Sequence, residues 1–194
     1  MKDFIILLVC YLIGNISFSY VLTKIKLKKD IREFGSGNAG TTNVLRVLGR
    51  KYAILVLVGD VLKGIIAIIL GKLLASSEMY IILCGLLVII GHNWPALMGF
   101  RGGKGIATSI GVFVTYDPIV AFICIGIGVL IIVISKYVSL GSVIGMSIFP
   151  IVVVMLSRSF EAFIFACCVS AISIYKHRAN ISRLIKGTEN KLKF

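Results

Sequence analysis

The sequence predicts an all-α integral membrane protein, a helical bundle of about seven transmembrane helices. Of its 194 residues, 58% are hydrophobic and only 15% are charged, and the mean hydropathy is +1.03. Soluble domains are about 45–50% apolar and about 25% charged, so this chain lacks the charged surface that water requires. Its apolar residues gather in runs that approach the roughly 20 residues of a membrane-spanning helix.

Seven apolar stretches follow one another, at 4–22, 53–75, 79–91, 104–116, 118–135, 139–156 and 160–175. The first is expected to stay in the protein, because Lys2 and Asp3 cancel and no small-residue cleavage site is present. The third and fourth are shorter than a full span. Glycines within the stretches favour close helix packing; they are Gly64, Gly71, Gly85, Gly111, Gly126, Gly128 and Gly145. We expect residues 1–194 to form a single membrane-embedded domain.

The basic residues predict the orientation of the bundle. The net charge is +13, from 21 Lys and Arg against 8 Asp and Glu. With seven spans and the N-terminus outside, one side receives 23–52, 92–104, 136–138 and 176–194, which hold 17 of the 21 cations. Because cytoplasmic segments are enriched in Lys and Arg, that side and the C-terminus are predicted to be cytoplasmic.

Several function classes are excluded by composition. The five cysteines all lie inside apolar runs without a C-x-x-C pair, which is typical of buried structural residues and not of a zinc site or a disulfide framework. The two histidines are far apart and lack metal-ligand spacing. A basic nucleic-acid surface needs a soluble face, which the apolar segments do not provide. We therefore expect no metal, no cofactor and no nucleic-acid partner.

The first polar segment covers 35–50 and has the composition of an anion site. It contains three glycines in six positions, at Gly35, Gly37 and Gly40. Glycines allow positive φ angles, so successive N–H groups can point inward as a nest. Thr41 and Thr42 are expected to start a short helix, and Arg46 and Arg50, four residues apart, to share one face of it. The alternative is a flexible linker.

The second segment covers 91–95 and 100–108. Gly-Gly-Lys-Gly before an apolar helix combines bare backbone, a cation and a helix N-terminus, which are the parts of a phosphate site. It is not a Walker A motif, and the alternative is an ordinary turn. His92, beside Trp94 and Pro95, fits either a ligand or a packing residue.

The third segment, 177–189, follows the last apolar stretch. A basic tail that binds anionic headgroups explains its lysines, whereas His177 and Asn180 lie where the span leaves the bilayer and can point back into the bundle. Within the second stretch, Asp60 and Lys63 are three residues apart. Buried charges in a span are functional candidates, and a mutually neutralising structural pair is the alternative.

Three loops with the composition of phosphate-binding sites, on a membrane protein, indicate a reaction between a phosphorylated substrate and a lipid substrate. The cytoplasmic face offers Asp30, Glu33 and Glu189 as its carboxylates. No Cys/His or Ser/His/Asp nucleophile arrangement is visible, which disfavours a covalent intermediate. A transporter of organic phosphates is the alternative, but it should show an inverted repeat and polar residues at the bilayer midplane. A phosphotransferase or phosphatase would want a cluster of metal-binding carboxylates.

Together, the three segments resemble the bacterial acyl-phosphate:glycerol-3-phosphate acyltransferase family. Its motif G-S-G-N-x-G-x-T-N-x-x-R is matched by 35–46, G-H-x-x-P with F-x-G-G-K-G-x-A-T by 91–108, and H-R-x-N-I-x-R-L-x-x-G-x-E by 177–189. Residues 60–64 also look like a family element. The resemblance covers nearly the whole chain and implies a small seven-spanning protein with cytoplasmic motifs.

The resemblance implies catalytic roles for Ser36, Arg46, Lys104, His177 and Asn180, and a structural role for Glu189. Ser139 and Ser142 resemble a weaker S-x-x-S element. With the loop residues, the expected substrate-binding set is Gly37, Asn38, Gly40, Thr41, Asn43, Arg50, His92, Gly102, Gly103, Gly105 and Ser142.

The implied reaction transfers an acyl group from acyl phosphate to the sn-1 hydroxyl of glycerol 3-phosphate at the cytoplasmic face of the bacterial inner membrane. Beyond these substrates and the membrane lipid, no obligate protein partner is expected. The His-x-x-x-x-Asp dyad of other acyltransferases is absent, because Leu97 follows His92 and Ser182 follows His177 at that spacing. Either His177 or the phosphate of the donor serves as the base.

Overall fold

The computed structural model describes residues 1–156 and 158–192, and within these ranges every regular element is a helix. Lys193, in the predicted basic tail, lies outside the described residues. The chain divides into two compact units, Met1–Tyr116 and Asp117–Phe194, and each is described by itself. That residues 1–194 form a single domain stays a prediction.

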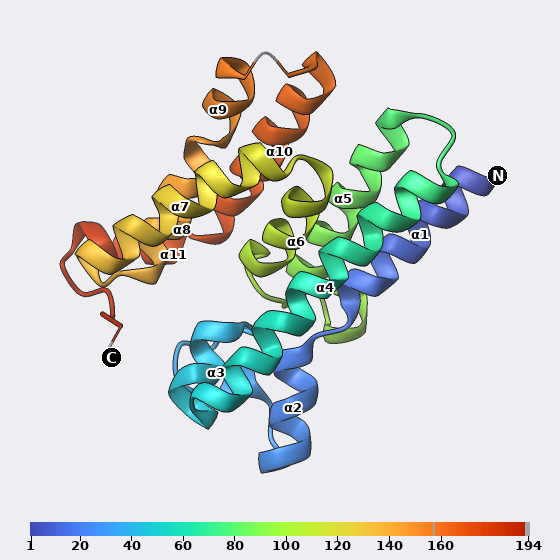
Figure 1. The fold of residues 1–194 in the computed structure, drawn as a ribbon. Coiled ribbons are helices and arrows are strands. Elements are labelled where there is room, and N and C mark those ends of the chain that lie inside the picture. The colour runs from blue at the N-terminus through green and yellow to red at the C-terminus, as the bar shows by residue number, and fades with distance from the viewer. Residues whose placement is uncertain (157, 193–194) are drawn as a thin grey trace. The chain divides into compact units, whose positions relative to one another are not determined.

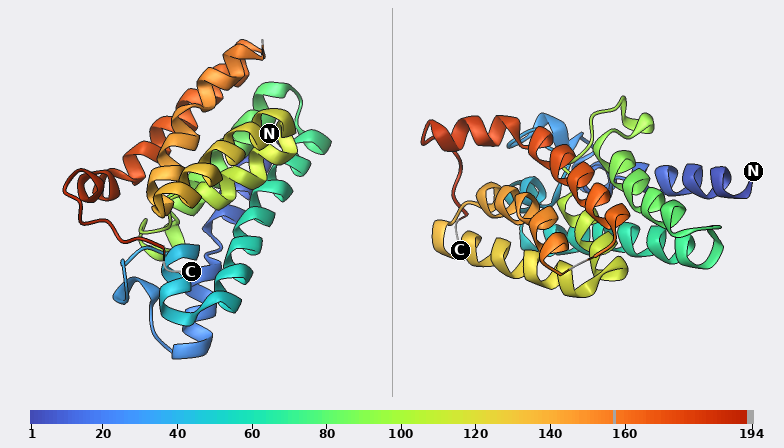
Figure 2. Two further views of the ribbon diagram at one scale, coloured as in Figure 1. Left: turned by 60° about the vertical axis from the view of Figure 1, so that its left-hand side comes forward. Right: turned by 90° about the horizontal axis from the view of Figure 1, so that it is seen from above.

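The first unit is built around one long helix. Its six α-helices are α1 (Lys2–Asn15), α2 (Phe18–Leu27), α3 (Thr41–Leu48), α4 (Arg50–Leu74), α5 (Glu78–Asn93) and α6 (Ile106–Tyr116). Two 3-10 turns, Ile31–Glu33 and Ala96–Met98, lie in the connections. In Figures 1 and 2, α1 runs beside α5, and α4 lies between α6 and α1.

Glycines let these helices approach closely. A Cβ on Gly64 of α4 would collide with the carbonyl oxygen of Thr108 on α6, and a Cβ on Gly111 of α6 with that of Val61 on α4. Small residues are how membrane helices bring their backbones together, since the lipid offers no hydrophobic drive for association. The predicted packing role of Gly64 and Gly111 is confirmed, whereas Gly126 of the second unit meets no atom within 4 Å.

The two ends of the first unit differ in chemistry. At one end, Asp3 accepts hydrogen bonds from the Ser76 N–H (2.9 Å) and hydroxyl (3.0 Å), which join the start of α1 to the α4–α5 connection. The α2–α3 region lies at the other end of α4 (Figure 1). The glycine-rich segment after α5 meets it there, as described below. The basic segments of this unit therefore share one end; which side of the membrane this end faces stays a prediction.

The second unit contains α7 (Pro118–Ser135), α8 (Val138–Ser147), α9 (Phe149–Met155), α10 (Phe160–Lys176) and α11 (Arg178–Ile185). Capping residues set two of the starts: Asp117 accepts the Val120 N–H at 3.2 Å, and Ser159 accepts the Ala162 N–H at 3.2 Å. Pro150, which lacks an N–H, lies in the first turn of α9, and α8 ends before it at Ser147. The axis bends by 60° between α10 and α11, at His177.

Length and composition qualify five segments of the described chain to cross a membrane. They are Lys2–Leu27, Arg50–Leu74, Glu78–Met98, Pro118–Ser135 and Val138–Met155, and the bent pair Phe160–Lys176 with Arg178–Ile185 makes a sixth if it is one span. The remaining apolar helix, Ile106–Tyr116, has 11 residues, well short of the roughly 20 that a full crossing needs. Each predicted stretch is helical, but seven crossings and the placement of the termini stay predictions.

Candidate active site

Asn43 holds the glycine-rich loop before α3. Its Oδ1 accepts the Ser36 N–H at 2.8 Å, and its Nδ2 donates to the carbonyl oxygens of Phe34 (2.9 Å) and Ile31 (3.3 Å). Gly35 and Gly37 have φ angles of 58° and 70°, so the loop takes the left-handed turns that its glycines permit. Ser36 is exposed on this loop, whereas Asn43 is buried behind it. Asn43 therefore shapes the loop from inside.

The two arginines that follow do not share a helix. The expected helix starts at Thr41, as predicted, but α3 ends at Leu48, and α4 begins at Arg50. Gly49 between them has φ 83° and ψ −177°, a conformation that breaks the helical path. The prediction that Arg46 and Arg50 lie on one face of one helix is thus wrong, because the glycine resets the direction of the chain. Both arginines are exposed.

The Gly-Gly-Lys-Gly loop folds back onto the end of α5. The Gly103 N–H donates to the His92 carbonyl at 3.1 Å, and the Gly102 N–H to the Asn93 carbonyl at 3.3 Å. These two amides therefore donate within the protein itself and are not the bare backbone donors that the sequence predicted for a phosphate site. Lys104 follows directly, and α6 starts at Ile106, so the cation stands two residues before the helix, as the sequence predicts.

Gly103 lies at the meeting point of the two loops of this unit. A Cβ at this position would collide with His92 Nε2 and would lie 2.7 Å from the carbonyl oxygen of Ala39, in the first loop. Only glycine therefore fits here without displacing either neighbour. The first and second polar segments, 60 residues apart in the sequence, come together as predicted for a shared site.

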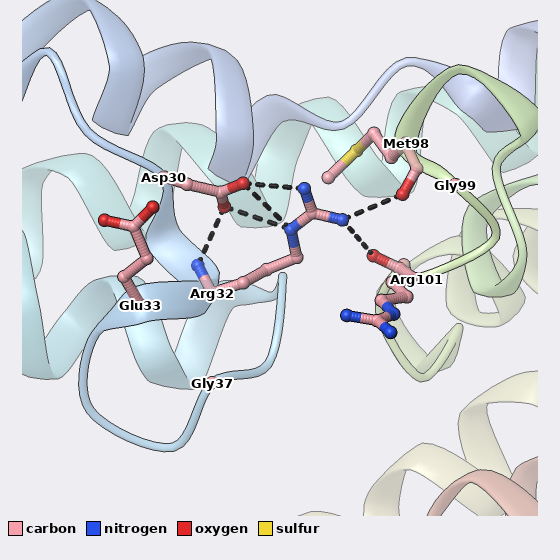
Figure 3. A pocket seen from close by; sticks show the side chains of 8 residues that line it. Asp30, Arg32, Glu33, Gly37, Met98, Gly99 and Arg101 are labelled. Carbon is pink, nitrogen blue, oxygen red and sulfur yellow. Dashed lines mark hydrogen bonds and ion pairs between the residues drawn. The ribbon is translucent and has the colours of Figure 1, made fainter.

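Arg32 joins the same two loops on the other side (Figure 3). Its guanidinium pairs with Asp30 at 2.6 Å, and its Nη1 donates to the carbonyl oxygens of Met98 (2.8 Å) and Arg101 (3.4 Å). The hydrogen bond from Arg32 holds the pKa of the Asp30 carboxyl below its ordinary value. The residues lining the adjacent pocket of about 650 Å³ are Asp30, Arg32, Glu33, Gly37, Met98, Gly99, Arg101 and Gly102.

Asp60 and Lys63 form a buried ion pair beneath the glycine loop. Lys63 Nζ lies 2.9 Å from Asp60 Oδ1, and the two side chains are 3% and 2% exposed. Lys63 Nζ also lies 2.9 Å from Nδ1 of His92, whose ring is buried too. Sequence reasoning left the pair open between a functional and a structural role and did not connect it with His92, because no local pattern reports a contact across 29 residues.

A carboxylate-centred network holds the C-terminal motif in the second unit. Glu189 Oε1 accepts from Ser139 Oγ (3.0 Å) and Asn180 Nδ2 (2.7 Å), and Oε2 accepts from Arg183 Nε (2.7 Å). Burial alone would raise the pKa of the Glu189 carboxyl, but the hydrogen bonds from Asn180, Arg183 and Ser139 outweigh burial and lower it. This geometry gives Glu189 the structural role that the motif implied.

His177 lies at the bend between α10 and α11. Its Nδ1 is 2.8 Å from the Ser173 carbonyl oxygen, and its side chain is buried. A carbonyl only accepts, so Nδ1 carries a hydrogen. Ser142 is half-buried on α8, one turn from the Ser139 that bonds Glu189.

The expected site residues thus fall into two groups. The first unit brings together the loops that carry Ser36, Gly37, Asn38, Gly40, Thr41, Gly102, Gly103, Lys104 and Gly105. The second unit carries Ser142, His177 and Asn180. Arg32 was missed by sequence reasoning. Its spacing of two from Asp30, just before a glycine-rich loop, was the available signal.

Comparisons with known proteins show the family of this chain. Residues 4–187 match the family model described as glycerol-3-phosphate acyltransferase. Curated glycerol-3-phosphate acyltransferases of Thermoanaerobacter pseudethanolicus and Clostridioides difficile are 50% and 46% identical to the chain; the matches cover 95% and 97% of this chain and 93% and 94% of theirs.

Two solved structures are also similar. They are crystal structures of the integral membrane glycerol 3-phosphate acyltransferase PlsY, in its glycerol 3-phosphate form (TM-score 0.94, 36% identity) and its lysophosphatidic acid form (TM-score 0.90, 35% identity). Each match covers 100% of this chain and 96% of that one. The chain is therefore a multi-pass membrane protein and belongs to the glycerol-3-phosphate acyltransferase family.

Proposed function

We propose that this protein transfers an acyl group from an acyl phosphate to the sn-1 hydroxyl of glycerol 3-phosphate, giving lysophosphatidic acid and inorganic phosphate. The hydroxyl oxygen attacks the acyl carbon, the bond from that carbon to the phosphate oxygen breaks, and the hydroxyl proton leaves with the phosphate. The observation that carries this proposal is family membership over residues 4–187, supported by the likeness to an acyltransferase solved in glycerol 3-phosphate and lysophosphatidic acid forms.

The choice of donor rests on the chemistry that the chain offers. In an acyl phosphate the acyl carbon is already activated, because phosphate is a good leaving group, so binding and orientation supply most of the catalysis. The positions five residues after the two histidines hold Leu97 and Ser182, so the His-x-x-x-x-Asp dyad of other acyltransferases is absent. An activated donor suits a protein without that dyad.

In the first unit, Ser36, Arg46 and Lys104 are assigned to catalysis. Both substrates carry phosphate groups whose mutual repulsion must be screened, and charge-assisted hydrogen bonds from Arg and Lys do this. Exposed cations at Arg46 and Arg50 support the assignment. The proposed binding residues of this unit are Gly37, Asn38, Gly40, Thr41, Arg50, Gly102, Gly103 and Gly105. Asn43 and His92 lie behind the loops and are assigned to act through them.

In the second unit, His177 and Asn180 are assigned to catalysis and Ser142 to substrate binding. We assign the proton to the phosphate of the donor, with His177 Nε2 orienting the acceptor hydroxyl. The hydrogen bond from Nδ1 to the Ser173 carbonyl supports this, because it fixes the orientation of the ring and its tautomer. In the His177→Gln variant, slow turnover with the pH profile of the wild type is expected; a profile flattened on its acidic side would identify His177 as the base.

The reaction is assigned to the cytoplasmic face of the bacterial cytoplasmic membrane, without a cofactor or an obligate protein partner. The strong bias of Lys and Arg toward one set of segments supports this side. The shared end of the first unit, where the α2–α3 region and the glycine loop meet, is where a soluble phosphate ester would enter from water while an acyl chain stays in the bilayer.

The test uses the purified full chain in detergent with palmitoyl phosphate and glycerol 3-phosphate, following phosphate release. Release that depends on glycerol 3-phosphate and is accompanied by lysophosphatidic acid supports the proposal. Release without glycerol 3-phosphate would overturn it. The Arg46→Gln variant is expected to lose at least about 100-fold in rate, as for removal of one transition-state donor, whereas Lys28→Gln, at an exposed lysine outside the loops, keeps the wild-type rate.

A further inference from the structure

Besides Asp60, the ammonium group of Lys63 has three polar neighbours outside its own helix. It donates to the carbonyl oxygens of Gly14 (3.2 Å) and Ile16 (2.8 Å), and it lies 2.9 Å from Nδ1 of His92. The two carbonyls lie at the end of α1, where backbone acceptors lack intrahelical partners and a cation is favoured. Lys63 therefore links the end of one helix to a ring beneath the glycine loop.

Asp60 supplies the charge that makes this arrangement possible. Its Oδ1 lies 2.9 Å from Lys63 Nζ, an ion-pair contact without hydrogen-bond alignment. Both side chains are at most 3% exposed. An isolated ammonium at such a site would cost several kcal/mol in lost hydration, and the neighbouring carboxylate offsets part of that cost and favours the charged form of Lys63. A charged lysine only donates.

The contact with the Lys63 ammonium, which only donates hydrogen bonds, indicates the tautomer of His92. Its Nδ1 lies 2.9 Å from Lys63 Nζ and 3.5 Å from Asp60 Oδ1. Because the nearer contact is with a group that only donates, Nδ1 is assigned as the acceptor, and the neutral ring carries its hydrogen on Nε2. Nε2 is the atom that a Cβ on Gly103 would strike, so this N–H faces the glycine loop. The main chain of His92 touches the same residue, since its carbonyl accepts the Gly103 N–H at 3.1 Å.

We propose that Asp60, Lys63 and His92 form a positioning relay that supports the glycine loop at Gly103 and thereby sets Lys104 for the phosphate of the acceptor substrate. The inference rests on the proposed function. Lys104 is the next residue after Gly103, so a shift of the loop moves its ammonium group directly. The relay touches the loop and not the substrate, and its loss acts through the geometry of the loop.

The tautomer is tested without reference to activity. The chain contains two histidines, so ¹⁵N-histidine labelling of the full chain in detergent gives two ring systems, and His177→Gln assigns them. We expect His92 to carry its hydrogen on Nε2 and His177 on Nδ1, which are opposite tautomers. A wild-type His92 with a protonated Nδ1 would overturn the relay, even if the protein proved to be an active acyltransferase.

Kinetics test the role of the relay in binding. The double variant Asp60→Asn/Lys63→Met removes both buried charges together, so no single charge is left unpaired. We expect it to retain a cooperative thermal transition, to lose the single His92 tautomer, and to raise the KM for glycerol 3-phosphate about tenfold or more, with the KM for palmitoyl phosphate changed less than about twofold. A KM for glycerol 3-phosphate equal to that of the wild type would refute the relay.

Two variants at His92 distinguish the roles of its two ring nitrogens. Gln places an amide N–H where Nε2 lies, and Asn places its oxygen where Nδ1 lies. We expect His92→Gln to keep the KM for glycerol 3-phosphate within about threefold of the wild-type value and His92→Asn to raise it about tenfold or more. The reverse order would contradict the proposal. Lys72→Met is the matched control: Lys72 is an exposed α4 lysine that donates to the Thr115 carbonyl at 2.6 Å, and its loss should change neither KM nor the histidine spectrum.

Discussion

Ser36 is held by Asn43 through a hydrogen bond of 2.8 Å from the Ser36 N–H to the amide oxygen of Asn43. The serine is exposed on the glycine-rich loop, and the asparagine is buried on α3. One residue of the motif thus meets water while another fixes the backbone beneath it. A residue of α3, the helix that follows the loop, therefore fixes the conformation of the loop.

Replacing Asn43 is expected to loosen the loop. Asn43→Ala removes one acceptor and two donor contacts and leaves buried backbone groups unpaired, which costs about 1–3 kcal/mol of unfolding free energy. Acyl transfer should fall by at least about tenfold, because Ser36 is no longer held. Thermal unfolding in detergent and the phosphate-release rate measure the two effects. Asn190→Ala, at an exposed asparagine, should change neither, and wild-type activity in Asn43→Ala would contradict this role.

Arg32→Gln is expected to separate the two loops that Arg32 joins. Gln cannot reproduce the pair with Asp30 together with the bonds to the Met98 and Arg101 carbonyls. We expect the KM for glycerol 3-phosphate to rise by about tenfold, with a smaller change in the unfolding temperature, because the side chain is 28% exposed and its bonds are screened by water. Steady-state kinetics against Lys29→Gln, an exposed lysine three residues before it, provide the comparison. An unchanged KM would show that Arg32 does not position the loops.

Gly103→Ala is expected to reduce activity strongly. The added methyl group meets His92 Nε2 and the Ala39 carbonyl, so either the loop or the ring must move. Overpacking of this kind costs about 1–3 kcal/mol, and displacement of Lys104 should reduce the rate by about 100-fold. Gly126→Ala serves as the control, because its Cβ meets no atom and alanine is the better helix former by about 1 kcal/mol. An active Gly103→Ala protein with a wild-type melting temperature would be incompatible with the packing described.

The Glu189 network should make stability sensitive to acid. The pKa of Glu189 is lowered in the fold, so the folded state binds fewer protons than the unfolded state as the pH falls below the ordinary value of 4.5. Its contribution is complete above that pH and is lost as the pH falls through the folded pKa. We expect the unfolding temperature to fall more steeply below about pH 4.5 in the wild type than in Glu189→Gln, which should already melt lower at pH 7. Glu161→Gln, at an exposed carboxylate, should keep the wild-type slope.

Hydropathy and local motifs were sufficient to predict the helices and the positions of the two loops of the first unit. Every apolar stretch is mostly helical, because a backbone in lipid must satisfy its own hydrogen bonds, although 4–22 and 139–156 are each divided into two helices. The start of α3 at Thr41 and of α6 after the Gly-Gly-Lys-Gly segment followed from glycine and capping chemistry within a few residues. These features depend on neighbours in the sequence and are therefore readable from it.

Other features depend on contacts that sequence patterns do not report. Arg46 and Arg50 look like an i,i+4 pair, but the φ of Gly49 divides their helix, and a glycine in a helical pattern fits either outcome. His92 could be placed near Gly103 only after α4 and α5 had packed, because Lys63 reaches it from another helix. The use of the Gly102 and Gly103 amides by the end of α5 is likewise a tertiary result.

The break between α1 and α2 cannot be straightened without consequence. In one continuous helix, the carbonyls of Gly14 and Ile16 would accept hydrogen bonds from the backbone N–H groups four residues later. The Lys63 ammonium would then lose both of these carbonyl acceptors in an apolar interior. The kink at Ile16 and Ser17 thus exposes backbone carbonyls that bind the ammonium group of Lys63 from α4. A substitution that merely improves the helicity of this hydrophobic segment would therefore disturb Lys63 and, through His92, the glycine loop.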